Sequence, residues 1–271
     1  MAGLGRICAF CGSTGTLSRE HLWPKCLHAR SGTTILSNVI GETEKAVSSE
    51  QTIRDVCTAC NSGPLSCLDE YISQLYDSYF QSVVRVGEGV RFRFDFNLLL
   101  RWLLKIGYNT ARARKWPLSN WLEFCDYVLG QGSRPDGCRV LLQLIVPTEV
   151  HRGSIKDNPA ATEIQPFPSR VATFDVRRLP GFKLAFMVSL NSYYFYVAVE
   201  TLDLPVHVRR RTFRKLVREI PGAYELSPGR RAMVYASSMD FIDHASQSEA
   251  FFRNLLLGKK WLQEAGMRRR R

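Results

Sequence analysis

The sequence predicts an α+β protein in two parts: a small N-terminal module, residues 1–84, organised around four cysteines, and a mixed α/β basic domain, residues 85–271. Three observations support this prediction. Four of the eight cysteines form two Cys-x-x-Cys pairs in the N-terminal part. Apolar residues at helical spacing follow the second pair. Beyond residue 85, stretches that alternate between apolar and polar residues are interleaved with helical ones.

The two cysteine pairs are Cys8 with Cys11 and Cys57 with Cys60. Each pair can give two thiolates to one tetrahedral zinc ion, and the chain between them closes around it. Four sulfur ligands leave zinc no open position for a substrate, so we expect a structural zinc site. The segment from Gly12 to Val56 is rich in Ser, Thr, Gly and Asn, which predicts an irregular loop with short strands.

Periodicity predicts the elements that follow. Apolar residues from Pro64 to Phe80 indicate a helix of about five turns. The alternating segment Arg91 to Phe96 predicts a strand, and it runs into a helical stretch from Leu98 to Ala113. We further expect strands at Arg139–Pro147 and Arg170–Asp175, a hairpin at Leu184–Glu200, a long loop at Pro147–Pro168, and helices at His207–Glu219 and Ser246–Met267.

The chain is basic, with 37 Lys and Arg residues against 25 Asp and Glu residues, a net charge of +12. This charge favours polyanionic partners, with nucleic acid first. An anionic membrane surface is less favoured, because the basic residues do not lie on one strongly amphipathic helix. Leu184–Val199 is the longest apolar stretch, and its polar interruptions are typical of a buried hairpin. Met1–Arg6 lacks the apolar core of a signal peptide, so we expect a cytoplasmic protein with reduced thiols.

Basic residues gather in one predicted helix, and contacts from such residues to phosphates would position nucleic acid without reading its sequence. The same basic pattern in the sequence is also typical of a solvated surface or of a helix that docks on an acidic protein. The residues are Arg209, Arg210, Arg211, Arg214, Lys215 and Arg218. In the apolar stretch around residues 101–109, Lys105 and Asn109 share one helix face and are weak candidates for substrate contact.

A more specific motif surrounds the cysteines. Glu20 and His21 follow the first pair and precede Pro24, and Asn61 comes directly after the last cysteine. This combination, with Cys-x-x-Cys-Asn-x-Gly at the head of a helix, resembles the HNH endonuclease family over about residues 7–71. The resemblance implies a treble-clef-like ββα-metal fold. In that fold two short strands and one helix hold a catalytic divalent metal, Mg²⁺ or Mn²⁺, against the scissile phosphate.

The resemblance also implies roles for individual residues. His21 would be the general base that takes a proton from the attacking water, since imidazole titrates near neutral pH. Glu20 would be an oxygen ligand to the metal, and Asn61 would either bind the metal or orient the base. The third element of the family falls on Asp69 and Glu70, a departure from the plain His-Asn-His pattern. Asp69 matches the acid-bearing variety in spacing, and the sequence leaves the choice between them open.

Each of these residues also has an ordinary structural interpretation. His21 could be a packing histidine, Asn61 a helix cap, and Asp69 and Glu70 a solvated helix face. The leading hypothesis is an HNH endonuclease acting on nucleic acid, DNA favoured over RNA, with prokaryotic antiviral defence as the setting that the family suggests. The alternatives are a nonenzymatic zinc-containing nucleic-acid-binding protein, and a nuclease subunit of a larger guided or toxin-like complex with a protein or ribonucleoprotein partner.

Overall fold

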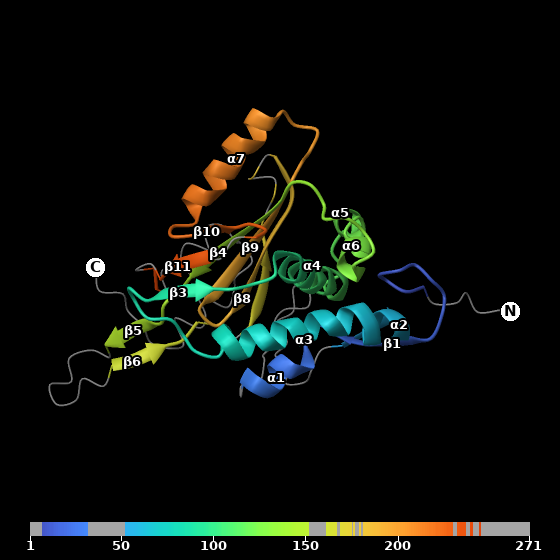
Figure 1. Ribbon diagram of the computed structural model, residues 1–271, viewed down its shortest axis with the longest axis horizontal. Helices are drawn as coiled ribbons and strands as arrows, with labels where there is room; N and C mark the ends of the chain where they lie inside the picture. Colours follow the sequence, from blue (N-terminus) through green and yellow to red (C-terminus); the bar gives the residue numbers. More distant parts are fainter. Residues whose placement is uncertain are drawn as a thin grey trace.

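The computed structural model describes residues 7–31, 52–151, 161–166, 169–174, 181–229 and 232–236, with the single positions 176, 179, 239, 240 and 244. Figure 1 shows a central sheet with helices on both sides and the N-terminal elements along one edge of the molecule. The helix α7 projects at the opposite end.

The N-terminal part is a hairpin followed by a long helical stretch. Strands β1 (Leu17–His21) and β2 (Thr52–Cys57) pair antiparallel, with an irregularity in register between Ser18 and Glu20. Helix α1 (Lys25–Ser31) follows β1. After β2 the chain turns at once into consecutive helical segments, α2 (Thr58–Cys60), η1 (Asn61–Leu65), α3 (Ser66–Leu75) and η2 (Tyr76–Phe80). The hairpin and this helical stretch therefore meet at the second cysteine pair.

Helix α4 (Phe96–Ala113) is the central helix of the fold. Asp95 caps it, because its side chain accepts a hydrogen bond from the backbone N–H of Leu98 at 2.9 Å. Gly107 allows a close approach to a neighbouring side chain: a Cβ at this position would lie 2.5 Å from Trp121. Trp121 belongs to the short helix α5 (Ser119–Leu122), and α6 (Cys125–Leu129) follows it.

The main sheet is antiparallel and has five strands among the described residues. Their order is β10 (Tyr224–Leu226), β4 (Cys138–Leu144), β9 (Tyr193–Glu200), β8 (Phe182–Leu190) and β7 (Arg170–Thr173). Two smaller pairs flank it, β3 (Gly89–Phe92) with β11 (Ala232–Tyr235), and β5 (Thr148–His151) with β6 (Ala161–Ile164). Helix α7 (Val206–Glu219) follows β9.

Side chains alternate between the two faces of this sheet, as the pleat of a strand requires. On β8, Phe186 and Val188 belong to a large apolar cluster that includes α3 and α4. Their neighbours Ala185 and Met187 belong to a smaller cluster on the other face, which Leu216 of α7 also joins. Both faces are thus covered, which explains why the strands are apolar throughout.

The mixed class with helices and strands is confirmed, and so are most of the expected elements. The helices around Pro64–Phe80, Leu98–Ala113 and His207–Glu219 and the hairpin at Leu184–Glu200 all form. The expectation of a loop at Pro147–Pro168 is wrong in its described part, because β5 and β6 pair there. The helix expected at Ser246–Met267 lies outside the described residues.

The large apolar cluster contains Cys8 and Leu68 from the N-terminal part and Trp102 and Phe195 from the rest of the chain. The apolar core therefore continues across residue 85, and the domain boundary near that residue stays a prediction. No helix in the described part of the chain combines the length and apolar character that a membrane span requires.

Candidate metal centre and active site

The four paired cysteines come together in space. Their sulfur atoms all lie within 4.8 Å of one another, and the Sγ atoms of Cys11 and Cys57 are 3.7 Å apart. This distance is far too long for a disulfide, whose S–S bond is about 2.05 Å. It matches a tetrahedral ion such as zinc, where a metal–sulfur bond of about 2.3 Å separates the sulfurs by about 3.8 Å. The predicted convergence of the four cysteines is confirmed, and the group fits a metal ion.

Backbone groups surround these sulfurs as they do in metal knuckles. The N–H of Cys57 donates to Sγ of Cys8 at 3.3 Å, and the N–H of Cys60 donates to Sγ of Cys57 at 3.5 Å. Hydrogen bonds with Ser13 lower the pKa of the Cys11 thiol to about 6, whereas burial raises the pKa of Cys60. Metal binding requires thiolates, so an ion at this cluster would displace the protons of these thiols.

The cluster is anchored to α4 by aromatic and cationic side chains. The guanidinium of Arg112 lies over the rings of Phe10 and Tyr108, at 5.0 and 4.8 Å from their centroids. The hydroxyl of Tyr108 donates to the carbonyl of Ala9 at 2.9 Å. Arg112 also forms an ion pair with Asp55 of β2. The first cysteine pair and the hairpin are thus attached to the same helix.

Asn61 ties the start of the helical stretch to the hairpin. Its amide nitrogen donates to the hydroxyl of Ser18 and to the carbonyl of Arg19, both at 2.9 Å. These two acceptors lie on β1 immediately before Glu20 and His21. Asn61 therefore holds in place the strand that carries both residues of the motif.

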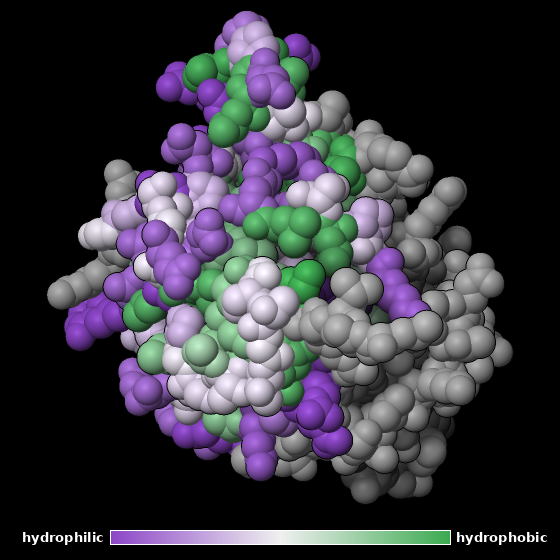
Figure 2. Space-filling model, turned by 90° about the vertical axis from the view of Figure 1, so that its right-hand side faces the viewer, coloured by the Kyte–Doolittle hydropathy of each residue, from purple (hydrophilic) through white to green (hydrophobic). Residues whose placement is uncertain are grey.

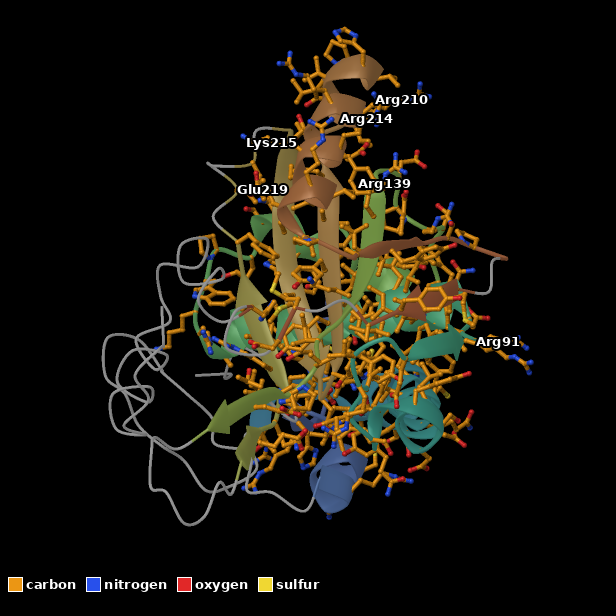
Figure 3. All side chains as sticks on the ribbon, turned by 90° about the vertical axis from the view of Figure 1, so that its left-hand side faces the viewer. Arg91, Arg139, Arg210, Arg214, Lys215 and Glu219 are labelled. Carbon is orange, nitrogen blue, oxygen red and sulfur yellow. The ribbon has the colours of Figure 1, made fainter. Side chains whose placement is uncertain are left out.

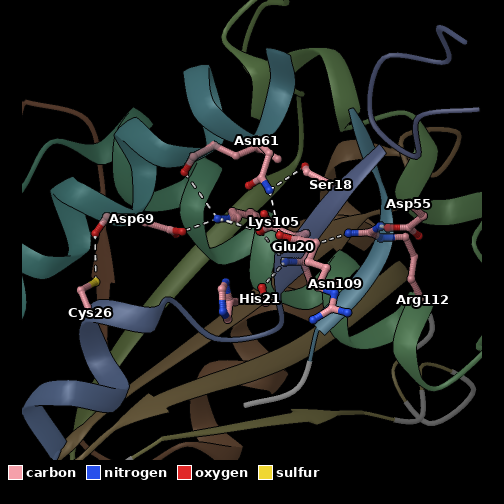
Figure 4. A network of polar contacts seen from close by, with 12 residues as sticks. Ser18, Glu20, His21, Cys26, Asp55, Asn61, Asp69, Lys105, Asn109 and Arg112 are labelled. Carbon is pink, nitrogen blue, oxygen red and sulfur yellow. Dashed lines mark hydrogen bonds and ion pairs between the residues drawn. The ribbon is translucent and has the colours of Figure 1, made fainter. Parts of the chain in front are cut away.

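Glu20 and Asp69 converge on the ammonium of Lys105, as Figure 4 shows. Lys105 Nζ lies 2.9 Å from Glu20 Oε1 and 2.7 Å from Asp69 Oδ1. The side chains of Lys105 and Glu20 are 1% and 3% exposed, and that of Asp69 is 27% exposed. Burial raises the pKa of Asp69, and the charge of Lys105 opposes this rise.

Asn109 completes the buried group. It is fully buried, and its amide nitrogen donates to Glu20 Oε1 at 3.1 Å and to the backbone carbonyl of His21 at 3.2 Å. Lys105 and Asn109 lie one helical turn apart on α4, so both side chains reach the same carboxylate. Helix α4 thus contributes two polar side chains to a site that the motif places on β1 and α3.

The motif residues differ in where they point. The side chain of Glu20 is buried, whereas the ring of His21 is half-buried. In Figure 4 this ring lies beside the group formed by Glu20, Lys105 and Asp69. Glu70 is exposed, on another side of α3 from Asp69.

The motif also predicts a catalytic metal, held by Glu20 and Asn61 with Asp69 or Glu70. Within the described residues, the four cysteines are the one group of three or more thiol, imidazole or carboxylate side chains whose ligand atoms meet. Glu20 and Asp69 supply two carboxylates, and the point between them is filled by Lys105.

The basic residues of α7 divide into two kinds. Arg209 is half-buried and holds the helix in place: it pairs with Glu200 of β9 at 3.0 Å and donates to the carbonyl of Leu204 at 3.1 Å. The other five face solvent, namely Arg210, Arg211, Arg214, Lys215 and Arg218. Figure 3 shows Arg210 and Arg214 along the projecting helix, and Figure 2 shows hydrophilic residues over this projection.

No protein-family model, curated protein or solved structure matches this chain.

Proposed function

We propose that this protein is a metal-dependent HNH endonuclease that hydrolyses phosphodiester bonds in nucleic acid, with DNA favoured over RNA. The observation that carries the proposal is the meeting of Glu20 and Asp69 on one point, next to the strand that bears His21. Carboxylates can hold a divalent metal, and an imidazole beside them can serve as general base, so this set of side chains is compatible with metal-assisted hydrolysis of a phosphodiester. The hairpin β1–β2 followed by α3 supports a ββα-metal arrangement for this part of the chain.

The cysteine cluster would hold a structural zinc ion in this proposal. Sulfur ligands at tetrahedral spacing favour zinc over harder ions. The ion would fix the turn between β2 and the helical stretch, where Cys57 and Cys60 are followed directly by Asn61. The four cysteines would thus use a bound zinc ion to position the active site, and the ion would take no part in the reaction.

In this proposal the two carboxylates would hold a second, catalytic ion. Oxygen donors are the ligands that Mg²⁺ and Mn²⁺ prefer, and Glu20 and Asp69 offer them on either side of the point that Lys105 Nζ occupies. A bound divalent ion supplies charge stabilisation for the phosphate and the leaving oxygen. His21 would take the proton from the attacking water, and Asn61 would keep β1, and hence this base, in place.

The exposed cations of α7 would bind the phosphate backbone of the substrate at a distance from the reaction. Their charge attracts nucleic acid through counterion release, and contacts of this kind carry no sequence information. Figure 1 places α7 at the opposite end of the molecule from β1 and α3. A single nucleic acid that touches both must therefore extend along the whole protein, and we expect long substrates to bind more tightly than short ones.

Plasmid nicking tests the proposal. Zinc-loaded protein is incubated with supercoiled DNA and either Mg²⁺ or Mn²⁺, with a folded RNA tested in parallel. The His21→Ala variant should lose about 100- to 10,000-fold in rate, because it lacks the general base, and should still bind DNA. The matched control is His207→Ala, which removes an exposed imidazole outside the site and outside the six basic residues. Equal activity of the two variants would contradict the proposal.

A second candidate function, a nonenzymatic nucleic-acid-binding protein, is favoured by one observation. The ammonium of Lys105 already neutralises part of the charge on the Glu20 and Asp69 carboxylates, so the group can also be understood as a structural ion-pair cluster. Wild-type protein that binds DNA but leaves it uncut with both metals would support this candidate over the nuclease.

A further inference from the structure

The two-stranded sheet of β3 and β11 has one buried face and one exposed face. Phe92, Ala232 and Val234 are buried and belong to the large apolar cluster. Side chains alternate along a strand, so the residues between them point away from this core. The exposed side chains on the outer face are Arg91, Met233 and Tyr235. These three residues, named the Tyr235 face below, offer a guanidinium, a thioether and an aromatic ring to solvent.

Tyr235 is the one exposed aromatic side chain among the residues that the structure describes, with 61% of its surface accessible. Its partner in the register is Gly89, and the ring lies against the backbone of this glycine. A Cβ at Gly89 would lie 2.7 Å from Cε1 and 3.0 Å from Cδ1 of the ring. One side of the ring is thereby packed on β3 while the rest faces solvent. A ring held in this way is available to stack on another flat group.

Positive charge lies next to this ring. Arg91 pairs with Met233 in the register and is the diagonal neighbour of Tyr235, a separation of about 7–8 Å that aromatic and long side chains can span. Arg93 is also exposed, two residues further along the chain. Within the described part of the chain, neither guanidinium takes part in an ion pair. Figure 3 shows Arg91 extending away from the body of the molecule, where it can contact an anionic partner.

Single-stranded nucleic acid has both features that complement this face, because its unpaired bases stack on aromatic rings and its phosphates attract cations. A duplex offers the phosphates but keeps its bases paired inside the helix. We propose that the Tyr235 face binds an unpaired stretch of nucleic acid, with a base stacked on Tyr235 and a phosphate contacted by Arg91. The inference rests on the proposed function for the class of partner. Figure 1 places β3 and β11 between helices α7 and α3, so a nucleic acid held by the cations of α7 can reach this face.

Fluorescence anisotropy with labelled oligonucleotides tests this inference without measuring cleavage. Zinc-loaded protein, without added Mg²⁺ or Mn²⁺, is titrated into oligo(dT) of about 16 nucleotides, near the upper end of common site sizes, and into a duplex of the same length. Tyr235→Ala should weaken binding to the single strand by about 5- to 150-fold, the loss of one stacked base, and should leave the affinity for the duplex unchanged. Tyr235→Phe keeps the ring and should bind oligo(dT) as the wild type does.

Leu122→Ala is the matched control, since it shortens another exposed apolar side chain, 55% accessible and located on α5. Tyr235→Leu separates stacking from packing, because leucine still covers Gly89 but offers no ring. This variant should bind oligo(dT) as weakly as Tyr235→Ala. Arg91→Ala should reduce the slope of log affinity for oligo(dT) against log salt by about 0.7, the contribution of one phosphate contact on a single strand.

Equal affinity of the wild type and Tyr235→Ala for oligo(dT) would overturn the inference while the proposed nuclease stands. Affinities for single strand and duplex that fall equally in Tyr235→Ala, together with its melting temperature, would also overturn it, because the ring would then only support the sheet. Loss of self-association in Tyr235→Ala at unchanged affinity for oligo(dT) would assign the face to a second copy of the chain instead. A wild type that binds neither oligonucleotide would overturn both the inference and the proposed function.

Discussion

Replacing Lys105 by methionine should destabilise the fold, and the structure indicates by how much. The side chains of Lys105 and Glu20 are almost fully buried, and Asp69 is 27% exposed. Removing one partner of a buried ion pair costs about 3–5 kcal/mol, because the other charge stays buried without compensation. Glu20 keeps its hydrogen bond from Asn109, and water reaches Asp69. We therefore expect a loss near the lower end, about 3 kcal/mol.

Urea unfolding followed by circular dichroism measures this loss, in zinc-loaded protein without added Mg²⁺ or Mn²⁺. Lys183→Met gives the reference, since its pair with the 43%-exposed Glu123 should contribute at most about 1 kcal/mol. The double variant Lys105→Met/Glu20→Gln should recover at least about 1 kcal/mol of the loss, because it removes the uncompensated carboxylate as well. If Lys105→Met is no less stable than Lys183→Met, the buried ion-pair cluster is not as described.

Three further predictions concern other parts of the molecule. Gly107→Ala should lower stability by about 1–3 kcal/mol through overpacking against Trp121, and an unchanged melting temperature would contradict that contact. Arg214→Ala should reduce the slope of log affinity for DNA against log salt by about 1, whereas Arg209→Ala should chiefly lower the melting temperature, because Arg209 anchors α7. Cys60→Ser should reduce bound zinc, measured by mass spectrometry of metals, from one ion per chain to a fraction of it; full retention would exclude a four-cysteine site.

Some features were predictable because the signal is local. The Cys-x-x-Cys spacing predicts that the two pairs together bind one ion. The regular apolar periodicity of residues 64–80 and 98–113 predicts helices directly. The apolar hairpin at 184–200 was equally clear, since its strands are buried on both faces. Such patterns need no knowledge of the rest of the chain.

Lys105 and Asn109 show why the site was harder to predict. They lie far along the chain from Glu20, and contacts at that separation leave no trace in local periodicity. Their only signal was the presence of two polar residues, one turn apart, in an otherwise apolar helix face. The burial of Glu20 was hidden for the same reason, because the residue that balances its charge comes from α4. Arg112 and Asp55, which join the cysteine pairs to this helix, gave no signal at all.

The short strands were missed for a different physical reason. β5 and β6 have four residues each, too few for an alternating pattern to stand out, and the prolines around them favoured a loop. β10 has three residues and β11 has four. Pairing with a partner elsewhere in the chain, rather than their own composition, makes these segments strands.

Anomalous diffraction from crystals of the zinc-loaded protein soaked in Mn²⁺ tests the central claim most directly. Data collected at the zinc and manganese edges distinguish the two ions. The account predicts zinc among the sulfurs of Cys8, Cys11, Cys57 and Cys60, and manganese bound by the carboxylates of Glu20 and Asp69. Sulfurs without a zinc peak, or carboxylates without a manganese peak at saturating Mn²⁺, would contradict it.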